Sequence, residues 1–274
     1  MEKSTNRGAS PFLIACQEGF EDIIRWLFEE CNINASHPAD GGFSPFYMAC
    51  QNGHLCAVQE LVREGQLDLT EAVQAANNNF GTTPLYIAAQ NGHLHILEYL
   101  MSQRTVSEQL MWQHQPENNG ATPFYISCEQ GHVDVARFMS LKGADVEAAN
   151  ANNSSPLFIA CLKGHLPVVK LLANELQVDC ERSNANGATP FYVSCEKGHL
   201  DVVRFLGGEK GVNVGVSNIN GVSPLWIACQ DGHDDVLTLP HYPTTIHQLM
   251  HPPVSTSARH FRTDGHFPYT PCSS

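Results

Sequence analysis

A proline recurs along this chain at a nearly constant interval, and this recurrence limits the possible folds more than any other feature. The copies are Pro11, Pro45, Pro84, Pro123, Pro156, Pro190 and Pro224. Successive copies are 34, 39, 39, 33, 34 and 34 residues apart. A fixed period between about 20 and 50 residues is typical of stacked-repeat proteins. We therefore expect one elongated array of seven units in which each unit contacts only its neighbours.

The residues around each proline predict a helical hairpin. A hydroxyl residue precedes every copy, as an N-cap does when proline takes the first helical position: Ser10, Ser44, Thr83, Thr122, Ser155, Thr189 and Ser223. A glycine lies eight residues after every proline, where it can end the helix in a left-handed conformation. An apolar run with helical spacing follows, such as Leu200, Val202, Val203 and Leu206.

The units resemble the ankyrin repeat, whose motif is Thr-Pro-Leu-His followed by Ala-Ala, Gly-His and an apolar second helix. Thr83-Pro84-Leu85, Ala88-Ala89 and Gly92-His93 match this motif. The stretches 184–187 and 143–146 look like the family's β-hairpin finger. The resemblance covers roughly residues 8–237. It implies an all-α repeat solenoid of stacked helix-turn-helix ankyrin-type repeats with short β-hairpin or loop fingers.

Two departures from the family pattern stand out. The motif histidine is replaced, mostly by aromatic residues, at Leu13, Tyr47, Tyr86, Tyr125, Phe158, Tyr192 and Trp226. We expect packing of these side chains to replace the histidine's hydrogen bonds, with the tyrosine hydroxyls bonded to local partners. The two 39-residue spacings carry about five extra residues each, in connections that include 67–72 and 106–110, where added length costs little.

The pattern divides the chain into three parts. Residues 1–7 are predicted to be a short tail, and residues 238–274, rich in proline and histidine, a disordered one. Between them, residues 8–237 form the repeats, at about 8–38, 39–77, 78–116, 117–149, 150–183, 184–217 and a truncated 218–237. In the first repeat, Arg25, Glu29 and Glu30 predict a polar outer helix, as a terminal unit requires.

Pro240 cuts off the second helix of the last repeat. We expect the missing part of this helix to leave apolar surface of the sixth repeat partly bare. A partner could cover that surface, the tail could fold back on it, or the chain could be a truncated form of a longer one; we favour truncation. The chain would then be a monomer or assemble through the incomplete repeat.

Composition bears on the classes of partner. The 15 Lys and Arg against 28 Asp and Glu give a formal charge of −13. Nucleic-acid affinity comes mainly from Lys and Arg, so no nucleic-acid partner is expected. A solvated acidic surface accounts for the charge, and a basic protein partner would also fit it. The sequence shows no secretory signal and no 18-residue apolar run, so no membrane span is expected. We expect a cytoplasmic location, and the nucleus remains an alternative.

Neither the cysteines nor the histidines predict a metal site, cofactor or catalytic centre. Six cysteines share one repeat position, where we expect small buried apolar side chains: Cys16, Cys50, Cys128, Cys161, Cys195 and Cys229. Six histidines follow the helix-ending glycine, one repeat apart and too distant to share an ion: His54, His93, His132, His165, His199 and His233. No catalytic motif occurs, so we expect no enzyme.

These features favour a non-catalytic scaffold or adaptor that binds a partner protein. In the ankyrin family, binding residues come from finger tips and from the two positions before the helix-ending glycine. Carried over, these positions are Gln51, Asn52, Gln90, Asn91, Glu129, Gln130, Leu162, Lys163, Glu196 and Lys197, with Phe43 and Phe80 as aromatic anchors near the fingers. The alternative is a regulatory ankyrin fragment of a larger polypeptide whose enzyme, channel or signalling domain is absent from this chain.

Overall fold

The computed structural model describes residues 10–31, 33, 42–63, 67–75, 81–103 and 120–238. The predicted tail 1–7, all but the first residue of the predicted tail 238–274, Phe80 and the insertion at 106–110 lie outside these residues. The described part of the chain is helical and contains no strand. The predicted fingers are therefore turns and loops in the described repeats, without a β-hairpin.

Each repeat begins with a first helix that starts at the recurring proline. These helices are α1 (Pro11–Glu18), α3 (Pro45–Asn52), α6 (Pro84–Gln90), α9 (Pro123–Gln130), α11 (Pro156–Lys163), α13 (Pro190–Glu196) and α15 (Pro224–Gln230). In all seven, the preceding Ser or Thr oxygen accepts a hydrogen bond from the third helical amide, which confirms the predicted caps.

A second helix follows the glycine in each repeat. These helices are α2 (Glu21–Cys31), α4 (Leu55–Arg63), α7 (Leu94–Ser102), α10 (Val133–Leu141), α12 (Leu166–Lys170), α14 (Leu200–Arg204) and α16 (Asp234–Leu237). In the fifth and sixth repeats the helix continues as a π-helical turn, η1 (Leu171–Glu175) and η2 (Phe205–Glu209). The seven glycines have positive φ angles, as predicted.

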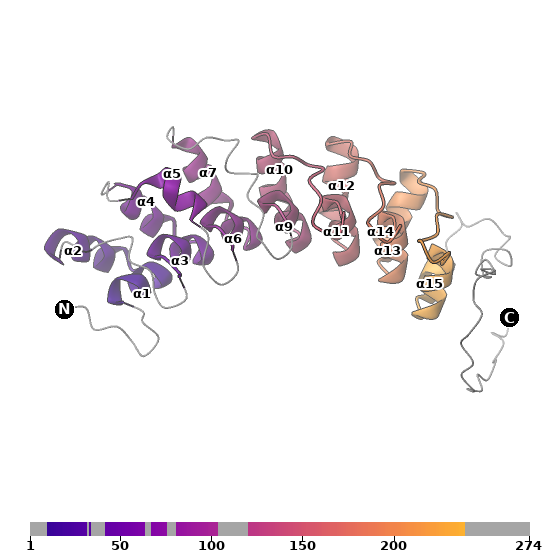
Figure 1. The fold of residues 1–274 in the computed structure, drawn as a ribbon, viewed down its shortest axis with the longest axis horizontal. Coiled ribbons are helices and arrows are strands. Elements are labelled where there is room, and N and C mark those ends of the chain that lie inside the picture. The colour runs from indigo at the N-terminus through magenta and orange to yellow at the C-terminus, as the bar shows by residue number, and fades with distance from the viewer. Residues whose placement is uncertain are drawn as a thin grey trace, which may run out of the picture.

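The repeats stack in chain order into a gently curved array (Figure 1). First helices pack on first helices, from α1 through α15, and second helices on second helices, from α2 through α16. The first helices and the loops between repeats lie along the concave side of the arc (Figure 1). This arrangement confirms the repeat solenoid.

One of the two insertions forms an additional helix, α5 (Leu69–Gln74), which packs against α6. Asp68 caps it by accepting hydrogen bonds from the amides of Thr70 and Glu71, at 2.9 and 3.3 Å. The helix stays attached because Leu69 and Val73 are buried in the core. The five extra residues therefore add packing as well as length.

The second helices direct one row of apolar side chains toward the preceding repeat. The row is the fourth residue after the glycine, and it is exposed by 1% or less in repeats two to seven: Ala57, Ile96, Val135, Val168, Val202 and Val236. In the first repeat the same position is Ile23, which is 47% exposed. No repeat precedes it in the described array, and this side chain stays about half exposed.

This direction changes two expectations about the ends of the array. Glu29 and Glu30 are exposed as predicted, yet the end face of the first repeat carries Phe20, Ile23 and Trp26, each about half exposed. The prediction of a polar outer helix in the first repeat is therefore wrong for this end face, which is largely apolar. At the other end, Phe205 and Leu206 of the sixth repeat are buried, and α14 packs on α12, α13 and the short α16. The expected bare apolar surface of the sixth repeat is therefore not found among the described residues.

Candidate protein-binding surface

In five of the six Gly-His turns, the histidine is hydrogen-bonded to the preceding repeat. Its Nε2 lies 2.9 Å from a backbone carbonyl oxygen of the preceding first helix, and because a carbonyl only accepts, Nε2–H is the donor. The five accepting residues are Gln51, Gln90, Glu129, Leu162 and Glu196. Each is the first of the two predicted binding positions, so the backbone there is fixed by the stack.

The same imidazole covers the preceding glycine. A Cβ atom on Gly92 would lie 2.6 Å from Nδ1 of His132, and one on Gly164 would lie 2.6 Å from Nδ1 of His199. In all six junctions between repeats, the nearest imidazole atom would lie between 2.4 and 2.8 Å from such a Cβ atom. This is shorter than the contacts that Cβ atoms make in proteins, so the ring would have to move. Gly232 has no atom within 4 Å of that position.

The predicted binding pairs are exposed in a regular way. The first residue of each pair is half-buried in the first six repeats. The second residue is exposed in every repeat: Glu18, Asn52, Asn91, Gln130, Lys163, Lys197 and Asp231. The array therefore presents one exposed side chain per repeat on a backbone that the histidines hold; we call these seven residues the exposed column.

Several members of the column already bond within the chain. The Asn91 side chain donates to the Gln51 carbonyl at 2.8 Å, beside the bond from His93, and Asn52 donates to the Met48 carbonyl at 3.1 Å. These two amides are therefore oriented before any partner arrives.

Both lysines of the column are paired with glutamates from the first binding positions. Lys163 Nζ lies 3.3 Å from Glu129 of the preceding repeat, and Lys197 Nζ lies 2.9 Å from its chain neighbour Glu196. Exposed pairs of this kind contribute little to stability, so a partner's charges can replace them at small cost.

A row of tyrosines lies under the column, at the position of the family's motif histidine. Tyr125 and Tyr192 accept hydrogen bonds from the side-chain amides of Asn150 and Asn218, at 3.0 and 3.1 Å, and Tyr47 shares one with Thr82 at 2.9 Å. The partners belong to the following repeat, so the expectation of local partners is wrong for these three hydroxyls.

Burial raises the pKa of two of these phenols. It raises the pKa of Tyr86 to about 12, and the nearby Glu129 carboxylate adds to the effect. Burial and Glu129 also raise the pKa of Tyr125. These two hydroxyls therefore stay protonated, and able to donate hydrogen bonds, well into the alkaline range.

The finger turns of the last three repeats are built around one asparagine each. Asn150, Asn184 and Asn218 each accept two backbone amide bonds through Oδ1, at 3.0–3.1 Å. Adjacent fingers are joined directly, because the amide of Ala185 donates to Asn152 O and that of Ile219 to Asn186 O, both at 3.0 Å. The three tips therefore form one connected edge.

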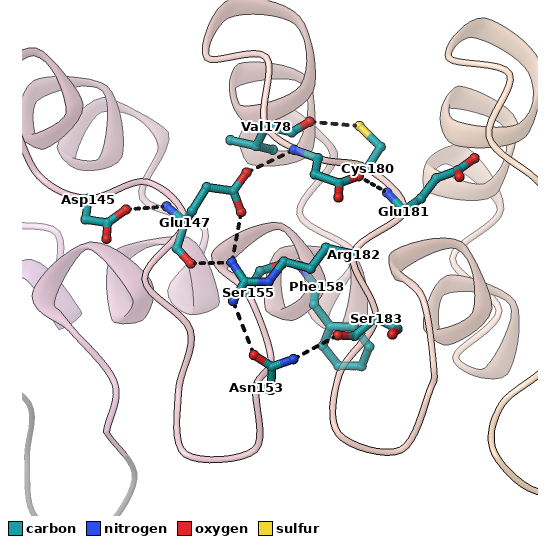
Figure 2. Close-up of polar contacts among 11 residues, drawn as sticks. Asp145, Glu147, Asn153, Ser155, Phe158, Val178, Cys180, Glu181, Arg182 and Ser183 are labelled. Atoms are coloured by element: carbon teal, nitrogen blue, oxygen red, sulfur yellow. Dashed lines mark hydrogen bonds and ion pairs between the residues drawn. The ribbon is translucent and has the colours of Figure 1, made fainter.

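Side chains reinforce this edge between the fourth and sixth repeats (Figure 2). Arg182 donates to the Glu147 carbonyl at 2.9 Å and to Asn153 Oδ1 at 3.2 Å. The Glu147 carboxylate accepts from the amide of Asp179 at 2.9 Å, and Glu181 does the same for the amide of Asn213, one repeat later, at 2.8 Å. These acidic residues hold the fingers in register.

The structure describes one of the two predicted aromatic anchors, and it also shows an exposed apolar residue at a finger tip that the sequence pattern did not indicate. Phe43 is half-buried, and its ring lies 5.6 Å from that of Tyr47, so part of its apolar surface is already used. Phe80 lies outside the described residues. Ile219, at the tip of the last finger, is 71% exposed. The aligned positions in the two preceding finger tips are Ala151 and Ala185. The larger apolar side chain at position 219 is the signal that could have identified this residue.

The repeated cysteines occupy the buried position predicted for them. Five of the six are buried and Cys229 is half-buried. Burial raises the pKa of Cys16 to about 12 and raises those of Cys50, Cys128 and Cys161 as well. They act as small apolar side chains beneath the column.

The described residues contain neither a cluster of metal ligands nor a membrane-spanning helix. None of their groups of His, Cys, Asp or Glu is arranged to hold a metal ion. None of the described helices has both the length and the apolar character needed to cross a membrane.

Comparison with known families agrees with the geometry. The family model described as ankyrin repeats (3 copies) matches residues 1–72, 65–150, 103–184, 140–218 and 157–239, which together span residues 1–239. No curated protein matches the chain.

Proposed function

Because the chain belongs to the ankyrin repeat family, we propose that it is a non-catalytic scaffold or adaptor that binds a partner protein through its concave face and finger tips. Ankyrin repeats are generally protein–protein interaction modules. The proposal assigns the contact to the exposed column and to the tips at 151–153, 185–186 and 219–220.

One observation supports this assignment above the others: the exposed column stands on a backbone that is hydrogen-bonded from repeat to repeat. Its side chains vary in charge along the array, from Glu18 through Asn91 and Lys163 to Asp231, while the residues around them are nearly the same in each repeat. A rigid frame with variable side chains favours specific recognition, because little conformational entropy is lost on binding. The paired Lys163 and Lys197 add charges that a partner could match.

The proposal includes a reducing, intracellular location, with the cytoplasm favoured. The free thiols support this, since disulfides are rare in that compartment.

Affinity purification with quantitative mass spectrometry tests the proposal, with the full chain as bait. The test variant is Gln130→Ala/Lys163→Ala/Lys197→Ala, which removes three neighbouring side chains of the column. The matched control is Glu98→Ala/Asp134→Ala/Arg204→Ala, three exposed residues on second helices. We expect captured proteins to be lost from the test variant and kept by the control. Equal capture by both variants would contradict the proposed surface.

A further inference from the structure

The outer face of the first repeat carries three exposed apolar side chains, two on α2 and one on the residue just before it. They are Phe20, Ile23 and Trp26, exposed by 51%, 47% and 57%. Their spacing of three residues places them in one stripe along the helix. We call these three residues the end stripe; α2 is the terminal second helix of the described array (Figure 1).

The same three positions are occupied differently in the later repeats. The position of Phe20 holds the histidine whose ring covers the preceding glycine, as His54 covers Gly19. The position of Ile23 is buried in every later repeat. The position of Trp26 holds Glu60 in the second repeat, and Glu60 bonds back to Arg25 at 3.0 Å. The end stripe therefore has the form of a repeat–repeat interface that is open on one side.

The charges around the stripe are acidic. Residues 11–31 contain five carboxylates and one guanidinium, a formal charge of −4. The exposed carboxylates are Glu18, Asp22, Glu29 and Glu30. The one cation, Arg25, is already held by Glu21 at 2.7 Å and by Glu60. An occupant of this face would therefore meet apolar surface in the centre and negative charge at the rim.

We infer that the end stripe is a second docking site, for a helix of another protein that carries an apolar stripe flanked by Lys and Arg. Such a helix buries its apolar side chains on Phe20, Ile23 and Trp26 in the way a preceding repeat would, and its basic residues face the acidic rim. A second copy of this chain would bring the same acidic rim against itself, which disfavours self-association. This site lies on the end of the array and is separate from the exposed column.

The test uses synthetic helical peptides of about five turns and the full chain. The first peptide has a leucine stripe with lysines on the other positions, the second has glutamates in place of the lysines, and the third has the first peptide's composition in scrambled order. Binding is measured by fluorescence anisotropy. We expect the lysine peptide to bind at least about tenfold more tightly than either of the others.

The decisive variant is Ile23→Glu/Trp26→Glu, with Ser102→Glu/Leu141→Glu as matched control. Ser102 and Leu141, the latter 78% exposed, lie at the surface of second helices, outside both the end stripe and the exposed column. Both variants add two negative charges, so unspecific attraction of the lysine peptide would make both bind it more tightly. We expect the end-stripe variant to lose about tenfold or more in affinity and the control to keep it. Circular dichroism should show both variants to be as helical as the parent chain.

Three results would overturn the inference. One is equal affinity of the lysine peptide for both variants. Another is a dimer in sedimentation velocity that Ile23→Glu/Trp26→Glu abolishes, since this would assign the face to a second copy. The third is a large gain in peptide affinity on removal of residues 1–9, because the chain's own terminus would then be the occupant.

Discussion

The imidazole of His132 lies against Gly92 so closely that a Cβ atom there would be 2.6 Å from Nδ1. The same ring donates from Nε2 to the carbonyl of Gln90, two residues before that glycine. The His132 side chain thus favours glycine at position 92 and fixes the backbone at Gln90, the first of the two predicted binding positions in that repeat. This relationship recurs along the array and links the folding pattern to the proposed binding surface.

Two requirements favour glycine at this position: the positive φ angle and the close approach of the next repeat's histidine ring. Alanine substitution at two of the glycines separates them. Gly131 and Gly232 have φ angles of +81° and +78°, so Ala is strained at both by roughly 1–2 kcal/mol. Only at Gly131 would the new Cβ also meet an imidazole, that of His165. We expect Gly131→Ala to lower the free energy of unfolding by about 1–3 kcal/mol more than Gly232→Ala, in urea denaturation. Equal losses would mean that the ring moves aside freely.

Two isoleucines at the same helical position test the direction of stacking. Ile96 is fully buried against the second repeat, whereas Ile23 is about half exposed at the end of the array. Ile96→Ala should lower the free energy of unfolding by about 2–5 kcal/mol. Ile23→Ala should change it by no more than about 0.5 kcal/mol. A large loss for Ile23→Ala would show that this face is covered in the isolated chain.

Removal of one phenol oxygen tests the bond between a first helix and the next finger. Tyr125→Phe leaves the Asn150 side-chain amide without the acceptor it has at 3.0 Å. We expect a loss of about 0.5–1.5 kcal/mol in the free energy of unfolding, measured in urea. A double-mutant cycle with Asn150→Ala isolates the pair, since Asn150 also supports the turn. A coupling energy of zero would rule out the inter-repeat bond.

His93 also predicts a dependence of stability on pH. Burial, as the largest cause, lowers the pKa of His93 below its ordinary 6.5. The unfolded chain therefore takes up this proton first as the pH falls, so its contribution to stability is complete above pH 6.5 and is lost toward the lowered pKa. An NMR titration should place the His93 midpoint below 6.5, with His93→Gln to assign the signal. A midpoint above 6.5 would show that burial does not dominate the pKa of this imidazole.

Local signals in the sequence were sufficient for the repeat framework. A hydroxyl before Pro84 and a glycine at 92 define a helix through contacts within a few residues, and the structure confirms them. Helix α5 escaped prediction because its residues fall outside the repeat frame. Asp68 followed by Glu71 is nevertheless an N-terminal helix signature that could have indicated it.

Features that depend on neighbouring repeats could not be predicted in the same way. The partner of Tyr125 is 25 residues away along the chain, in the next finger. The exposure of Ile23 and Trp26 depends on which neighbour their helix faces, and helical periodicity does not contain that direction. For the same reason, the spacing indicated which positions of the column are exposed but gave no sign that neighbouring backbone carbonyls accept hydrogen bonds from the next repeat's histidines.

The most direct test of the proposed function is hydrogen–deuterium exchange on the chain with a partner obtained by affinity purification. We expect the partner to slow exchange at the ends of the first helices, at residues 129–130, 162–163 and 196–197, and at the finger tips 151–153 and 185–186. Slower exchange confined to the second helices, such as α7, α10 and α12, would place the partner on the opposite side and contradict binding through the exposed column.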